Sequence, residues 1–348
     1  CKQGEDCRVV IPLYSDMKPQ YRERLAFVTA FTVQLSWRRQ YCGLFTVREG
    51  DVTYYLLDNE QYFKRSGLYG YFDDAERYAF FSMAVLELCK EVHFFPDILH
   101  ANDWQTALVP IYLNLFYQQE DARYRRIRSV FTIHNIQYQG QFGLDTAGDV
   151  FSIPWEKRGA VEYDGCVNLL KGAIECADRV NTVSPTYARE ILDPYFGHGL
   201  DRFLRERREK LSGILNGIDQ QGNDPAVDPN LFHPYDREHL EGKEENKRGL
   251  QELFGLDQKA EGPLLGIVSR LVSHKGMDLI ACWPWGYRWR RWVPATMPMN
   301  NFSCRLPSVI LGRWGFESDF CQIWPAKFTA GRICSLCPLK ASHAALPK

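Results

Sequence analysis

Residues 97–113 read DILHANDWQTALVPIYL, and residues 129–135 read SVFTIHN. Each stretch begins as a short apolar run that stops at polar residues, which is typical of a buried strand. The first stretch then continues with apolar side chains at helical spacing. We therefore expect a helix over 104–117, with Asn102 or Asp103 as its N-cap. A strand, a helix and a second strand in this order predict neighbouring parallel strands.

The same alternation extends in both directions along the chain. Strands that alternate with helices predict an α/β fold, a doubly wound parallel sheet with helices on both faces. A further helix is expected over 73–92, where an acidic start precedes apolar residues at helical spacing. The other expected elements are strands at 8–14, 27–37, 51–59 and 179–184, a helix at 167–177, a helix that starts at Pro185, and a strand and turn at 211–219.

The length of 348 residues is sufficient for two domains, since single hydrophobic cores stop growing below that size. Residues 236–254 predict a charged, mostly solvated connecting helix, and PLLGIVSR at 263–270 predicts the first strand of a new α/β domain. We expect a first domain at 1–235, the connecting helix and the start of a second domain at 236–280, and a different segment at 281–348.

Composition excludes several classes of protein. Apolar residues make up 45% of the chain, and no apolar run approaches the length of a membrane span. The first residues, CKQGEDC, lack the layout of a signal peptide, so we expect a cytoplasmic protein without membrane partners. The eleven cysteines are scattered, and Cys334 and Cys337 form an isolated C-x-x-C. Reduced thiols are predicted, with no metal site and no cofactor.

Ligands of parallel α/β sheets bind beyond the carboxyl ends of the strands, so polar residues that end the apolar runs are the candidates. Three of them also have a purely structural interpretation: Asp103 as a helix cap, His134 as a structural histidine, and Asn216 as part of an Asn-Gly turn. Among these candidates, Arg270 and Lys275 give the most specific indication of a ligand. Two cations that bracket a short strand-to-helix loop suit a diphosphate, and the helix N-terminus adds partial positive charge.

Five segments in order resemble one family. They are HANDWQTALVPIYL at 100–113, SVFTIHNIQYQGQF at 129–142, ADRVNTVSPTYAREI at 177–191, LSGILNGID at 211–219 and GIVSRLVSHKGMDLI at 266–280. Together they resemble bacterial glycogen synthases, the starch synthase type of retaining glucosyltransferase. The resemblance implies a GT-B fold of two facing Rossmann-like domains. It also implies transfer of glucose from ADP-glucose to the non-reducing end of an α-1,4-glucan such as glycogen, with retention and without a metal.

The resemblance also assigns roles to particular residues. Arg270 and Lys275 match the pair that neutralises the donor diphosphate, as departure of ADP requires. His134 matches the strand-end histidine that contacts the transferred glucose, while Asp103 and Asn216 match polar groups of the same pocket. We take His134 and Asp103 as catalytic candidates, and Asn135, Asn216, Arg270 and Lys275 as substrate-binding candidates.

Residues 281–348, here called the tail, differ in composition from the rest of the chain. Residues 281–348 hold nine Lys and Arg against two acidic residues, together with six tryptophans and seven prolines. Its Arg and Trp follow no helical or strand period. We therefore predict a segment that was never selected to fold, rather than the alternative of a nucleic-acid-binding arm.

Reverse translation of the tail explains its unusual composition. Because Trp has one codon, Cys-Trp-Pro-Trp-Gly at 282–286 constrains the DNA closely. Read one base earlier, the same bases encode Leu, Met or Val, then Leu, Ala, again Leu, Met or Val, and Gly, which continues the helix begun by GMDLI. The same shift over 331–345 permits the Glu-Pro-Cys-Gly that the family carries in its C-terminal domain. We predict that residues 281–348 are an out-of-frame translation.

The sequence also departs from the family pattern at its start. The family begins with an apolar strand and a K-T-G-G-L-G-D-V loop that meets the donor, and this sequence begins after them, at CKQGEDCRVVIPLY. We therefore expect little glucosyl transfer from the chain as printed. The alternative description is a catalytically inactive fragment of such an enzyme, at most a weak glucan binder.

Overall fold

The structure is a computed structural model that describes residues 4–259, 264–266 and 333–335. The chain divides into two compact units, with the boundary between Asn216 and Gly217. The sequence predicted a boundary between residues 235 and 236. The segment 217–235 contains neither helix nor strand, and the predicted end of the first domain at residue 235 stays a prediction.

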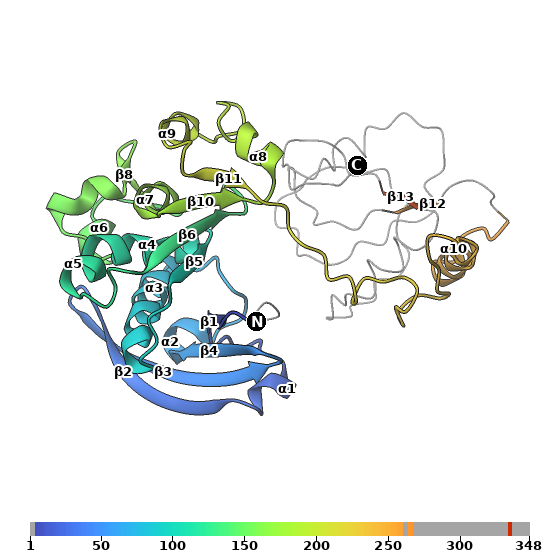
Figure 1. The fold of residues 1–348 in the computed structure, drawn as a ribbon, viewed down its shortest axis with the longest axis horizontal. Helices are drawn as coiled ribbons and strands as arrows, with labels where there is room; N and C mark the ends of the chain where they lie inside the picture. Colours follow the sequence, from blue (N-terminus) through green and yellow to red (C-terminus); the bar gives the residue numbers. More distant parts are fainter. Residues whose placement is uncertain (1–3, 260–263, 267–332, 336–348) are drawn as a thin grey trace. The chain divides into compact units, whose positions relative to one another are not determined.

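A four-stranded parallel sheet forms the upper half of the first unit in Figure 1. Its order is β11-β10-β6-β5, and every neighbouring pair is parallel. The strands are β5 (Ile98–Asn102), β6 (Arg128–Ile133), β10 (Arg179–Thr182) and β11 (Leu211–Gly213). This sheet confirms the predicted parallel arrangement. All four carboxyl ends therefore lie at one edge.

The connection from β5 to β6 is helical, as predicted, but it is not one α-helix. It consists of a 3-10 turn, an α-helix, a π-helical turn and a last α-helical turn. Pro110 lies within the first turn of the α-helix, where its missing N–H leaves no hydrogen bond unmade. The segments are η1 (Trp104–Thr106), α4 (Leu108–Tyr112), η2 (Leu113–Tyr117) and α5 (Gln118–Glu120).

The helices that follow β9 (Cys166–Asn168) and β10 begin with side-chain caps. Asn168 accepts a hydrogen bond from the Lys171 N–H at the start of α7, and Ser184 accepts one from the Tyr187 N–H at the start of α8. Pro185 is the first residue of α8, as the sequence predicted. The helices are α7 (Leu169–Cys176), α8 (Pro185–Glu190) and α9 (Asp201–Glu206).

A mixed sheet of order β1-β4-β3-β2 forms the other half of the first unit. β1 and β4 are parallel, and the remaining pairs are antiparallel. The predicted strands at 8–14, 27–37 and 51–59 are present, and β3 is an additional strand that the sequence analysis did not single out. Three consecutive buried residues, Cys42, Gly43 and Leu44, break the alternation in β3 because it is an interior strand. The elements are β1 (Arg8–Pro12), α1 (Pro19–Arg22), β2 (Ala26–Leu35), β3 (Arg38–Glu49), β4 (Val52–Asp58) and α2 (Glu60–Phe63).

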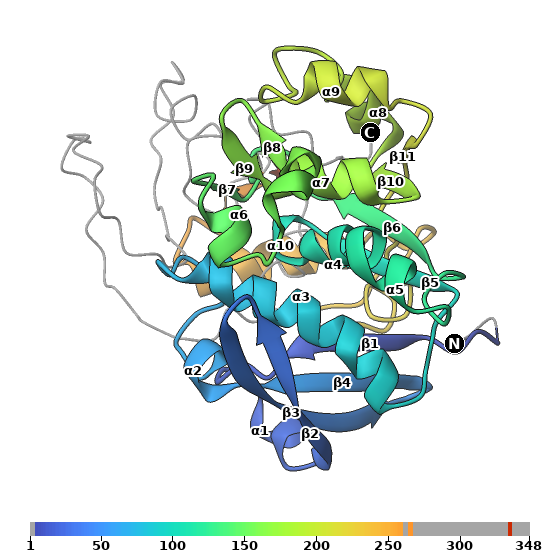
Figure 2. The ribbon, with the colours of Figure 1, turned by 90° about the vertical axis from the view of Figure 1, so that its left-hand side faces the viewer.

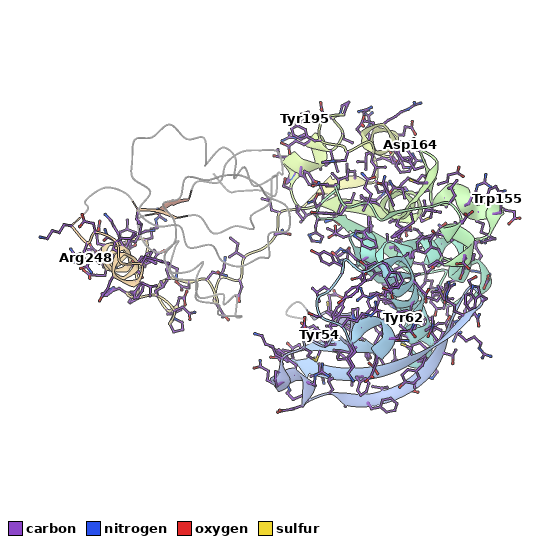
Figure 3. The ribbon with its side chains drawn as sticks, turned by 180° about the vertical axis from the view of Figure 1, so that it is seen from behind. Tyr54, Tyr62, Trp155, Asp164, Tyr195 and Arg248 are labelled. Carbon is purple, nitrogen blue, oxygen red and sulfur yellow. The ribbon has the colours of Figure 1, made fainter. Side chains whose placement is uncertain are left out.

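Helix α3 (Asp74–Glu91) lies between the mixed sheet and α4, as Figures 1 and 2 both show. It confirms the predicted helix at 73–92. Its buried residues lie on all sides of the helix and include Ala79, Phe80, Ala84 and Leu86, none of which is exposed. Figure 3 shows Tyr62 of α2 within the same packed interior, whereas Trp155 lies at the margin of the unit.

A small antiparallel sheet of order β7-β9-β8 covers the segment between β6 and α7. The sequence analysis did not predict it, because strands of two or three residues are too short to show a period. Its elements are β7 (Gln141–Phe142), α6 (Thr146–Asp149), η3 (Trp155–Ala160), β8 (Glu162–Tyr163) and β9 (Cys166–Asn168).

In the second unit the connecting helix is shorter than predicted. Helix α10 (Gly242–Leu253) starts after a turn in which Asp236 accepts hydrogen bonds from the N–H groups of Glu238 and His239. The helix is also less solvated than expected: Leu250 and Asn246 are fully buried. The Asn246 amide oxygen accepts a hydrogen bond from Phe232 N–H, so the preceding segment folds back over the helix.

Strands β12 (Leu264–Gly266) and β13 (Ile333–Ser335) of the same unit pair in parallel. β12 lies within the strand predicted at 263–270. In the part of the chain that the structure describes, no helix combines the length and apolar character needed to cross a membrane.

Candidate functional site

Two predicted residues meet where β5 and β6 end. The register pairs Asn102 of β5 with Thr132 of β6, so the residues that follow these strands leave the sheet side by side. The Asp103 N–H donates to the Thr132 carbonyl at 3.0 Å. The Asp103 Oδ1 in turn accepts a hydrogen bond from the His134 N–H at 2.8 Å. The two catalytic candidates are therefore joined directly.

The backbone of Asp103 adopts an unusual conformation, with φ 56° and ψ −179°. Residues other than glycine in this region cost about 1–3 kcal/mol, and such strain gathers at functional sites. The side chain makes no capping hydrogen bond to the helical turn that follows, so a capping role does not account for this residue. The strained backbone instead directs the carboxylate towards the end of β6.

Burial raises the pKa of the Asp103 carboxyl above its usual range. Hydrogen bonds from the backbone N–H groups of His134 and Asn135 lower the pKa and offset part of this effect. A partly desolvated carboxylate costs stability and is a strong hydrogen-bond acceptor. The position is therefore better suited to binding a polar group than to stabilising the fold.

The ring of His134 is exposed to solvent and oriented by Asn102. Its Nε2 lies 3.0 Å from the Asn102 Oδ1, and because an amide oxygen only accepts, Nε2 carries the proton. In the neutral ring Nδ1 is then the acceptor. Asn102 is held in turn by Thr106, whose hydroxyl lies 2.5 Å from the Asn102 N and 2.7 Å from its carbonyl oxygen. The sequence pattern indicated Asn102 as a helix cap and gave no signal for Thr106.

A hydrogen-bonded chain crosses three strands beneath the site. His100 Nε2 lies 2.6 Å from the Thr132 hydroxyl, which donates to the Asn181 Oδ1 at 2.6 Å. Because the hydroxyl proton is used in that bond, His100 Nε2 donates to Thr132. Desolvation lowers the pKa of His100, and the nearby His134 lowers it further. The chain ties β5, β6 and β10 together below Asp103.

Asn135 forms a local turn next to His134. Its Oδ1 accepts from the Gln137 N–H at 3.0 Å, and its carbonyl accepts from the Tyr138 N–H at 3.2 Å. The Ile136 N–H donates to the Tyr187 hydroxyl at 3.1 Å, which fixes the turn against α8. The structure therefore places Asn135 beside the other two residues, and its role in substrate binding stays a prediction.

Trp104 connects the site to its surroundings. Its ring packs against Tyr78 with centroids 5.3 Å apart and against Phe142 at 6.0 Å. A Cβ on Gly140 would lie 2.9 Å from the same ring, so only glycine allows this close approach. The sequence pattern indicated Trp104 only as the start of a helix, and nothing in a single sequence distinguishes it from an ordinary core aromatic.

The other predicted site residues make no hydrogen bond with this group in the described part of the chain. Asn216 is exposed, three residues beyond the end of β11, and its side chain makes no hydrogen bond with a described residue. The predicted Asn-Gly turn at Asn216 is not formed, because residues 214–219 have no turn. Arg270 and Lys275 lie outside the described residues. The site that the structure supports thus consists of Asp103, His134 and Asn135 with Asn102.

Comparison with known proteins identifies the lineage of this site. Residues 1–206, more than half of the chain, match the family described as the starch synthase catalytic domain. The chain belongs to this family. Asp103, His134 and Asn135 all lie within the matched residues.

Curated relatives agree with this membership. The chain is 47% identical over 317 residues to a glycogen synthase of Ligilactobacillus salivarius, covering 90% of this chain and 64% of that protein. It is 45% identical over 286 residues to a glycogen synthase of Clostridioides difficile, covering 80% of this chain and 59% of that protein. The chain therefore spans about three fifths of the length of these relatives.

A solved structure agrees as well. The catalytic domain of starch synthase IV from Arabidopsis thaliana, bound to ADP and acarbose, superposes with a TM-score of 0.72 at 32% identity. The match covers 80% of this chain and 58% of that one. Together with the parallel sheet, this similarity confirms the predicted α/β fold of the GT-B class.

Proposed function

We propose that this chain comes from a glycogen or starch synthase that transfers glucose from ADP-glucose to the non-reducing end of an α-1,4-glucan, with retention of configuration. The observation that carries the proposal is the joined pair of Asp103 and His134 at the carboxyl edge of a parallel sheet, in a chain of the starch synthase family. The glycogen synthases among its relatives support the same activity.

The geometry suits the chemistry of glucosyl transfer. As ADP departs, positive charge develops on the glucose ring, and hydrogen bonds to its hydroxyls that strengthen in the transition state lower the barrier. The exposed His134 ring offers Nδ1 as an acceptor for such a hydroxyl, while Asn102 fixes its orientation. The Asp103 carboxylate is held by the His134 N–H and keeps further lone pairs for a second hydroxyl.

The diphosphate of the donor requires positive charge, which Asp103, Asn102 and Asn135 do not provide. In our proposal Arg270 and Lys275 supply it, and Asn216 contributes a polar group to the glucose pocket. The starch synthase IV domain that is bound to ADP supports an ADP-containing donor. A cytoplasmic location and independence from metals, nucleic acid and membranes remain predictions from the sequence.

The test uses a repaired protein, in which the frame after residue 280 is corrected and the family's K-T-G-G-L-G-D-V loop precedes Cys1. ADP release from ADP-glucose is followed with glycogen present, and UDP-glucose serves as the control donor. We expect transfer from ADP-glucose, and a larger fall in kcat than rise in KM for His134→Ala. Arg270→Ala and Lys275→Ala should each cost about 2–4 kcal/mol of transition-state stabilisation. Wild-type rates in all three variants would refute the assigned site.

The chain as printed gives a second comparison. We propose that it shows little or no transfer, because an out-of-frame segment at 281–348 cannot supply the glucose contacts of the family's C-terminal domain. Resequencing the DNA around codons 279–283 should reveal the displaced base. Turnover of the printed chain equal to that of the repaired protein would contradict the frameshift.

A further inference from the structure

The connection between α2 and α3 exposes aromatic side chains to an unusual degree. Within the stretch SGLYGYFD at 66–73, Phe72 is 99% exposed and Tyr69 is 61% exposed. Single exposed apolar residues need no explanation, but two large rings on one short loop leave apolar area in contact with water. Such a loop is either mobile and incidental or held in place for a ligand.

Hydrogen bonds from within the loop show that it is held. The Asp74 Oδ2 accepts from the N–H groups of Gly70 at 2.6 Å and Tyr71 at 3.1 Å. The Tyr78 hydroxyl donates to the Leu68 carbonyl at 2.5 Å. At the ends of the loop, the Arg65 guanidinium binds both oxygens of Asp73, at 2.6 and 2.7 Å.

A fully buried arginine supports the loop from below. Arg77 has no exposed surface, and its Nε donates to the Tyr62 carbonyl at 2.7 Å. It also pairs with the Asp74 Oδ1 at 2.5 Å, and its guanidinium lies 4.9 Å from the centroid of the Tyr71 ring. Burying an arginine costs free energy of desolvation unless its donors are hydrogen-bonded. The contacts of Arg77 offset this cost and hold the loop in shape.

Trp104 places the loop next to the candidate site. Tyr78, which holds the loop at Leu68, packs edge-on against Trp104, and Trp104 directly follows Asp103. In Figure 1 the connection between α2 and α3 lies on the side of the unit towards which the β6 and β10 arrows point.

A second loop with an exposed aromatic ring also approaches Trp104. Gly140 packs directly on the Trp104 ring, and Tyr138, two residues earlier, is 49% exposed. Exposed Gln137 adds an amide next to Tyr138. The partly buried Trp104, which directly follows the strained Asp103, thus contacts both loops that carry exposed rings.

We propose that Tyr69, Phe72 and Tyr138, here called the aromatic rim, bind the glucose units of the acceptor glucan that follow its non-reducing end. The inference rests on the proposed function and names the surface that its acceptor uses. A pyranose ring has an apolar C–H face and a hydroxyl periphery, which suits a rigid surface of aromatic faces with tyrosine hydroxyls and an amide beside them.

The test is isothermal titration calorimetry of the full chain with maltoheptaose. We expect Tyr69→Ala, Phe72→Ala and Tyr138→Ala each to weaken binding about tenfold, the scale for loss of an aromatic anchor. The matched control is Trp155→Ala. Trp155 is also a large exposed ring, 68% exposed, but lies at the margin of the unit in Figure 3. It should bind maltoheptaose like the parent chain.

The outcomes separate this inference from the proposed transfer reaction. Because the three rings are exposed, unchanged melting temperatures are expected and show that the variants fold. Parent-like affinity in all three variants, an equal loss in Trp155→Ala, or no binding by the parent would overturn the inference. A changed oligomeric state with unchanged affinity would assign the rim to a second copy and overturn it too. Failure of ADP-glucose turnover in the repaired protein would refute the proposed function and leave the binding result standing.

Discussion

The carboxyl edge of β5 and β6 and the loop at 66–73 both present functional groups, but they are positioned by opposite means. Asp103 and His134 are the first residues beyond two paired strands, so strand register places them. The loop has no strand or helix, and its shape depends on Arg77 and Asp74, which follow it in the sequence and lie beneath it. A site at strand ends can be predicted from a pattern, whereas a site on a braced loop cannot.

The largest effect should come from removing the support of the loop. Arg77→Met leaves Asp74 buried without its partner, and breaking a buried pair in this way costs about 3–5 kcal/mol. We expect a large fall in the free energy of unfolding, measured by urea denaturation. Arg126→Met is the control, because Arg126 is exposed and its side chain has no partner among the described residues. It should change stability by less than about 0.5 kcal/mol. Equal effects of the two substitutions would contradict the bracing role.

An intermediate effect is expected at the strand edge. Asp103→Asn keeps an acceptor oxygen for the His134 N–H but removes the charge, and in the repaired protein it should lower kcat about 100-fold, the scale of one preorganised polar contact.

Stability should respond to the same substitution in the opposite sense. Because burial raises the Asp103 pKa, the stability contribution of this group is full below its unfolded value and declines as pH rises through the folded value. Asp103→Asn should therefore melt at a higher temperature than the parent near pH 7, and this advantage should vanish near pH 4. An advantage that grows towards acid pH would show that the carboxylate is stabilised in the fold.

The smallest effect concerns the loop backbone. Gly70 has φ 100°, and a Cβ there would meet nothing within 4 Å, so Gly70→Ala introduces conformational strain and no clash. A cost of about 1 kcal/mol is expected, together with weaker maltoheptaose binding.

Gly148 provides the matched control, since it lies in α6 without a positive φ. Gly148→Ala should leave binding unchanged and stabilise the protein by about 0.5–1 kcal/mol. Thermal melts and calorimetry of both variants measure the difference, and equal signs for the two would show that Gly70 does not require its conformation.

Much of the fold followed from local pattern. The parallel strands at 98–102, 128–133 and 179–182, helix α3 and the start of α8 at Pro185 agree with the expectations. The additional strand β3 and the small sheet β7-β9-β8 were missed, one because it is buried on both faces and the other because it is too short. Helix α10 begins later than expected because Asp236 forms a turn, a local competition that helix periodicity does not show.

The sequence by itself determined the alternation of strands and helices, and with it the edge at which Asp103 and His134 had to emerge. Only the tertiary structure decided what these residues do there. The Asp103 carboxylate binds a backbone N–H that is 31 residues away rather than capping its own helix, and this choice depends on the register between β5 and β6. The aromatic rim likewise depends on contacts of Arg77 and Trp104 with distant segments. The physical reason is that periodicity reports which face of an element is buried, whereas a partner across the core is specified only when the elements pack.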